Sequence, residues 1–141
     1  MSRIRRAPVM FAALALSLGA CDPETPTRND HPDIAAVRLT AGAQSVTVTE
    51  SGSQTGTLTV PVGQTAVTVT WLDSSGASMT FDQVVTMQIV AVVAGTGVSF
   101  QPAGYTGGLL IATSPGQKAM TVRLIHGDHP DFEQTVNFTV S

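Results

Sequence analysis

Strict alternation of apolar and polar residues after position 33 is the feature that most limits what this chain can fold into. Valine, leucine and tryptophan hold every second position in several short runs, and threonine holds most positions between them, as from Val67 to Trp71. A period of two puts one set of side chains on a buried face and the other in water, which is typical of half-buried β-strands. Since residues 34–141 carry no helical stripe, the sequence predicts an all-β domain there.

Turn-forming residues divide this domain into short strands. Gly, Pro, Asp and Ser cluster between the apolar runs, for example at 73–76 and 115–116, where they favour tight turns. Many short strands at this spacing, in a domain of roughly 100 residues, are typical of an immunoglobulin-like β-sandwich. The predicted strands cover residues 34–40, 45–50, 56–60, 65–72, 84–93, 97–101, 108–113, 118–126 and 132–140.

The segment Ile89–Ala94 interrupts the alternation because it is apolar at every position. Such a run fits either a central strand that is covered on both sides or an edge strand that something else covers. Periodicity alone leaves both alternatives open.

The first 20 residues have the composition of an export signal. Three arginines precede an apolar run of ten residues from Val9 to Leu18, which is shorter than the roughly 20 residues needed to span a bilayer. A core helix with a buried free cysteine is the alternative, and the cationic flank favours the signal peptide.

The residues from Leu18 to Cys21 read Leu-Gly-Ala-Cys and resemble the lipobox of bacterial lipoproteins. The resemblance implies that residues 1–20 are a cleaved signal peptide and that Cys21, the sole cysteine, receives a lipid. It also implies export across the cytoplasmic membrane and attachment to the bacterial cell envelope, which is stable when more than one acyl chain is present. The identity of Asp22 leaves the inner and the outer membrane open as alternatives.

Residues 21–33 predict a flexible tether after the acylated cysteine. They contain three prolines, many charges and no large apolar residue, so they cannot bury enough surface to fold. Removal of the signal peptide leaves four cationic and ten acidic side chains, a net charge of −6. Such a chain lacks the basic surface that nucleic acid requires, so no nucleic-acid partner is expected.

Residues 58–65 contain a Val-Gly-Gln-Thr turn, the next strand ends in Asp-x-x-Gly at 73–76, and residues 110–116 form a second turn of small residues. These segments resemble the bacterial immunoglobulin-like domains of group 2. The resemblance implies a sandwich that acts as a binding or structural module, with Trp71 in its core. The Ser-rich middle of that family and its short Val-Ala-x-Val strand are missing, which leaves the strand pairing between 84 and 108 open.

No combination of residues predicts catalysis. The sequence contains no nucleophile elbow, Cys–His pair, phosphate-binding glycine loop or calcium loop, so the chain is not expected to be an enzyme. The expected partner of the module, beyond the membrane that holds its lipid, is an unidentified envelope protein or polysaccharide.

His126, His129 and Asp131 lie within six residues and form the candidate metal site. Imidazole and carboxylate groups are ligands of Zn and Cu, so a periplasmic metal-binding lipoprotein is the alternative function. Against this alternative, residues 127–131 have the composition of a hairpin loop, and a zinc site needs three or four ligands. The same Asp-His-Pro-Asp tetrapeptide recurs in the tether, where His31 is a further candidate ligand.

Overall fold

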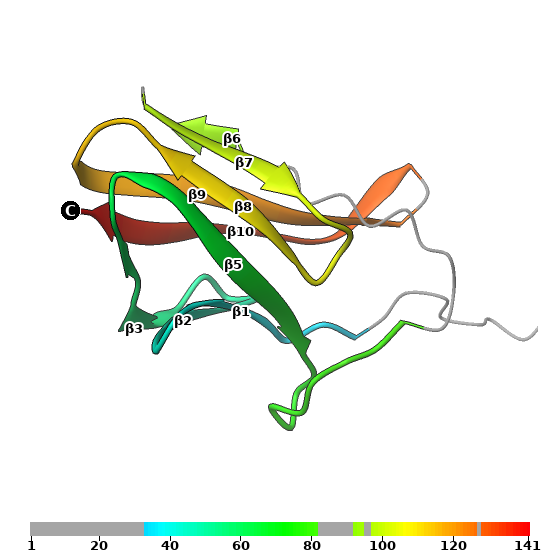
Figure 1. The fold of residues 1–141 in the computed structure, drawn as a ribbon. Coiled ribbons are helices and arrows are strands. Elements are labelled where there is room, and N and C mark those ends of the chain that lie inside the picture. The colour runs from blue at the N-terminus through cyan, green and yellow to red at the C-terminus, as the bar shows by residue number, and fades with distance from the viewer. Residues whose placement is uncertain (1–32, 82–91, 95–96, 127) are drawn as a thin grey trace, which may run out of the picture.

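The computed structural model describes residues 33–81, 92–94, 97–126 and 128–141, and within them the chain is all-β (Figure 1). Two sheets enclose one hydrophobic core, so the predicted all-β sandwich is confirmed. No helix among the described residues is long and apolar enough to cross a membrane. The strands are β1 (Ala36–Ala41), β2 (Gln44–Thr49), β3 (Gln54–Thr57), β4 (Thr59–Val60), β5 (Gly63–Leu72), β6 (Val92–Ala94), β7 (Val98–Pro102), β8 (Gly107–Ala112), β9 (Gly116–His126) and β10 (His129–Val140).

The larger sheet has the strand order β3-β2-β1-β5-β8-β7, and the smaller sheet has the order β4-β10-β9-β6. The neighbouring strands are antiparallel except β4 and β10, which run parallel. The β4–β10 pair therefore ties the C-terminal strand to a segment from the first half of the domain.

One predicted strand is divided in the structure, and another lies mostly outside the described residues. The predicted strand at 56–60 is divided at Leu58, because β3 belongs to the larger sheet and β4 to the smaller one. Leu58 is buried at this crossing, and its backbone oxygen accepts a hydrogen bond from the backbone N–H of Thr139. Of the predicted strand at 84–93, residues 84–91 lie outside the described residues and the last two belong to β6.

The core consists of the apolar half of each alternating strand. On β5, for example, Val67 and Val69 are buried whereas Thr68 between them is exposed. Trp71 is 1% exposed, and its Nε1–H donates to the backbone oxygen of Tyr105 at 2.8 Å, which satisfies the polar atom of this buried ring. The other fully buried large side chains are Val37, Leu39, Val46, Val48, Leu58, Val60, Leu110, Met120, Val122, Leu124 and Val136.

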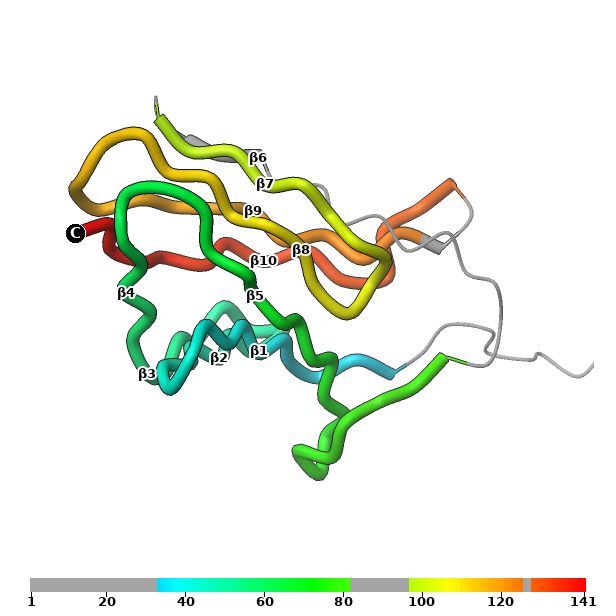
Figure 2. The backbone as a smooth tube through the Cα atoms, in the orientation of Figure 1, coloured from blue at the N-terminus to red at the C-terminus, as the bar shows by residue number. Residues whose placement is uncertain are grey.

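The chain enters the sandwich at one end and reaches its last residue at the other (Figure 2). At the first end, the N–H of Ala35 donates to the backbone oxygen of Leu72 at 2.9 Å. At the opposite end, the N–H of Ser141 donates to the backbone oxygen of Val60 at 2.9 Å. The 12 residues of β10 connect the two ends over roughly 40 Å.

Candidate functional site

The β9–β10 hairpin contains His126, His129 and Asp131 of the candidate metal site, and the structure pairs the two histidines more closely than the sequence predicts. His126 and His129 lie opposite each other in the strand register. The prediction of a loop from 127 to 131, followed by a strand from 132, is wrong because β10 already begins at His129. The backbone position of His126 is described, but its side chain lies outside the described part of the chain.

A β-bulge at Asp131 explains why pairing continues so close to the turn. Pro130 is opposite Ile125 and Phe132 is opposite Leu124, so Asp131 is the extra residue on β10. A bulge interrupts the alternation and redirects the side chain of the extra residue. The Asp131 side chain is 1% exposed, although aspartate is rarely buried.

The imidazole of His129 lies between two carboxylates. Its Nδ1 is 3.0 Å from Oδ1 of Asp128, and its Nε2 is 3.7 Å from Oδ1 of Asp131. The Asp128 side chain is fully exposed and the His129 side chain is half exposed, whereas Asp131 is buried. The hydrogen bond with His129 lowers the pKa of Asp128 from its ordinary value.

Aromatic rings surround the base of the hairpin. Phe132, directly after the bulge, meets the ring of Trp71 edge to face with the centroids 5.6 Å apart. Tyr105, whose backbone oxygen binds Trp71, meets Phe81 in the same manner at 5.3 Å. These contacts pack the first residues of β10 against the end of the sandwich where the chain enters.

The distance between His129 and Asp131 is close to what a shared metal ion requires. Zinc ligands lie about 2.0–2.1 Å from the ion, so two ligands in a tetrahedral array are roughly 3.3 Å apart. The observed 3.7 Å between Nε2 and Oδ1 is slightly longer. Among the side chains that the structure describes, no group of three or more His, Cys, Asp and Glu residues is placed to hold a metal ion. Cys21 and His31 lie outside the described residues.

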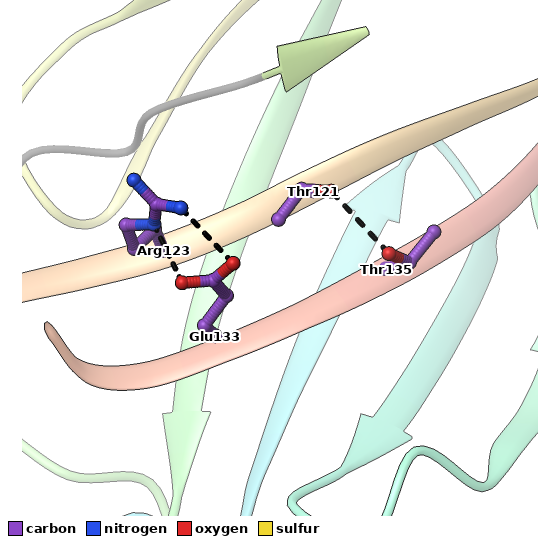
Figure 3. A network of polar contacts seen from close by, with 4 residues as sticks. All are labelled: Thr121, Arg123, Glu133 and Thr135. Atoms are coloured by element: carbon purple, nitrogen blue, oxygen red, sulfur yellow. Dashed lines mark hydrogen bonds and ion pairs between the residues drawn. The ribbon is translucent and has the colours of Figure 1, made fainter. Parts of the chain in front are cut away.

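The outer face of the β9–β10 ladder carries polar side chains that pair across the strands (Figure 3). Arg123 forms a bidentate ion pair with Glu133, with Nε–Oε2 at 2.8 Å and Nη2–Oε1 at 3.0 Å. The hydroxyls of Thr121 and Thr135 are 3.3 Å apart. The hydrogen bond with Arg123 lowers the pKa of Glu133, and the same bond raises the pKa of Arg123. Since each of these partners is engaged by the other, the pairs stabilise the ladder and present no reactive group.

A second polar site joins β3 to the other end of the ladder, and no pattern in the sequence indicated it. Gln54 bonds to Asn137 and Gln117 bonds to Thr139, although 83 and 22 positions separate the partners. Only the strand register brings these side chains together. No family model, curated protein or solved structure matches this chain, so the site is interpreted from its own geometry.

Proposed function

We propose that the protein is a non-catalytic, lipid-anchored module of the bacterial cell envelope with an immunoglobulin-like fold. The strand order is the observation that carries the fold assignment. An immunoglobulin sandwich places strands B, E and D in one sheet and strands C, F and G in the other. In the order of the sheets, β5, β8 and β7 match strands B, E and D, and β6, β9 and β10 match strands C, F and G.

Two features depart from an antibody domain. The hairpin of β1 and β2 lies beside β5 and, together with β3, extends the larger sheet. Trp71 lies on β5, the counterpart of strand B, whereas the tryptophan of antibody domains lies on strand C. The Trp71 ring packs against Phe132 in place of a disulfide, which is consistent with a domain that contains no cysteine after Cys21.

The lipid anchor rests on the likeness of residues 18–21 to a lipobox. A Cys21→Ser variant tests it, because serine lacks the thiol that forms the thioether. We expect the wild type to incorporate labelled palmitate and to fractionate with membranes, and the variant to lose both properties. Ser17→Ala changes the same region without touching the four lipobox residues and serves as the control. Equal membrane fractions for wild type and Cys21→Ser would refute the anchor.

Metal binding at the hairpin is the second candidate function, and the His126–His129 register favours it. His126 and His129 face each other in the backbone register, and Oδ1 of Asp131 lies 3.7 Å from Nε2 of His129, which supports a Zn or Cu site as a proposal. The measurement is the metal content of protein purified without an affinity tag. We expect the His126→Ala, His129→Ala double variant to lose the metal and His31→Ala to retain it. Equal content in the double variant, or no metal in the wild type, removes this candidate.

A further inference from the structure

A shallow groove between β3 and the β9–β10 ladder has the chemistry of a binding site for a neutral ligand. Its volume is about 190 Å³, and its rim carries three carboxamides and two hydroxyls, from Gln54, Gln117, Asn137, Thr57 and Thr139. We call it the carboxamide groove. Leu58 and Phe138 also line it, and both are almost completely buried.

The carboxamide of Gln54 shows how this groove pairs with an amide. Its Nε2 donates to the backbone oxygen of Asn137 at 2.9 Å, and its Oε1 accepts from the backbone N–H of Asn137 at 2.9 Å. The side chain therefore occupies the place of a neighbouring strand along part of the β10 edge. These two bonds hold β3 beside β10 and fix one wall of the groove.

The other two carboxamides keep hydrogen-bonding capacity for a ligand. Gln117 uses one N–H to donate to the hydroxyl of Thr139 at 2.9 Å. Within the described ranges, no hydrogen bond uses the side-chain oxygen of Gln117 or of Asn137, and both residues are exposed. Each therefore offers an N–H donor and an oxygen acceptor to a ligand, such as a hydroxyl group or one side of a secondary amide.

The groove contains no charged side chain, which decides the class of ligand. A charged group bound there would lose water without gaining an opposite charge, and this costs binding energy. A neutral sugar offers hydroxyls to the carboxamides. An acetamido substituent adds an N–H donor for the oxygen of one carboxamide and a C=O acceptor for the N–H of another.

The position of the groove agrees with a ligand outside the membrane. Gln117 and Thr139 are paired one residue from the end of β10, next to the C-terminal Ser141. The chain enters at the other end, where Trp71 packs against Phe132 and thereby against the hairpin. Roughly 33 Å of β10 separates His129 from Thr139. In a domain anchored through Cys21, a step that rests on the proposed function, the groove lies at the end of the sandwich opposite the point where the chain enters.

We propose that the carboxamide groove binds a neutral glycan strand that carries hydroxyl and acetamido groups, as in an envelope polysaccharide built from N-acetylated amino sugars. The test uses the full acylated protein in detergent and purified peptidoglycan sacculi as the probe. The bound fraction is measured by cosedimentation over a range of protein concentrations. Chitotetraose, which has acetamido groups, and maltotetraose, which has only hydroxyls, serve as soluble competitors.

We expect Gln117→Glu to weaken the apparent affinity about tenfold, because it replaces the donor N–H with a carboxylate in an uncharged groove. Gln101→Glu makes the same change at an exposed position on β7 and should bind as the wild type does. Chitotetraose should displace the wild type and maltotetraose should not.

Absence of sedimentation, equal affinity of the two variants, or failure of chitotetraose to compete would each overturn the glycan proposal. Failure of the anchor is detected separately by the membrane fraction of Cys21→Ser. A wild-type protein that fractionates with membranes but does not sediment with sacculi therefore refutes only the glycan proposal for the groove. A wild-type protein that sediments with sacculi but carries no lipid refutes only the anchor.

Discussion

Replacement of Gln54 by alanine is expected to destabilise the sandwich although the residue is exposed. The change removes both 2.9 Å bonds between its carboxamide and the backbone of Asn137. Each hydrogen bond contributes about 0.5–1.5 kcal/mol net, and water reaches this open groove to replace part of the loss. The expected decrease in the free energy of unfolding is therefore about 1–2 kcal/mol. For a domain of this size, this corresponds to a decrease in Tm of roughly 4–12 °C.

Urea unfolding followed by circular dichroism measures this change. Gln54→Met keeps most of the side-chain volume but cannot form either bond, so it should lose nearly as much stability as Gln54→Ala. Gln64→Ala removes another exposed glutamine, on β5, for which no side-chain hydrogen bond exists within the described residues, and it should change the free energy by less than about 0.5 kcal/mol. If Gln54→Ala and Gln64→Ala unfold at the same urea concentration, the hydrogen bonds of the Gln54 carboxamide to β10 do not stabilise the fold.

Three further substitutions test the core, the backbone packing and the outer face. Trp71→Phe removes the donor to Tyr105 and leaves a cavity, so thermal unfolding should show a loss of about 2–4 kcal/mol; a loss below about 1 kcal/mol would contradict the packing. Gly107→Ala places a Cβ 2.5 Å from the backbone oxygen of Val67 and should lower the free energy of unfolding in urea by about 2–3 kcal/mol. In the control Gly42→Ala, the new Cβ meets no atom within 4 Å, so only the φ of +59° is unfavourable, by about 1 kcal/mol. Glu133→Gln should reduce stability more at pH 7 than at pH 3, because a carboxyl whose folded pKa lies below its unfolded value stabilises the fold above the unfolded pKa and loses this effect as pH falls through the folded pKa. An equal deficit at both pH values in urea titrations would refute this role of the Arg123 pair.

The strands were predictable because burial on one face imposes a period of two. On β9, the inward residues Met120, Val122 and Leu124 are all buried, as the alternation requires. The pattern does not state which strand lies beside which, since every strand of this kind offers the same apolar face. For the same reason it does not show that β3 and β4 belong to different sheets, although both fall within one predicted strand.

The hairpin and the groove depend on details that periodicity does not carry. The bulge that buries Asp131 adds one residue to one strand, and neither proline nor aspartate at 130–131 specifies it. The sequence predicts a loop for these residues because their composition favours turns. The carboxamide groove depends on long-range register, so Gln54, Gln117 and Asn137 look like ordinary surface residues until the strands are paired.

The placement of the two ends of the domain determines how it responds to mechanical tension. A pull between Ala35 and Ser141 draws β1 and β10 in opposite directions along their own axes (Figure 2). β10 is held by 11 register pairs to β9 and by two to β4, and a force along the strand loads these pairs together in shear. Forced unfolding is governed by the rate of crossing the unfolding barrier. In shear, crossing this barrier requires many hydrogen bonds to break together. If Cys21 carries the proposed lipid, this arrangement would transmit load through β10 between the end where the chain enters and a ligand bound near Ser141.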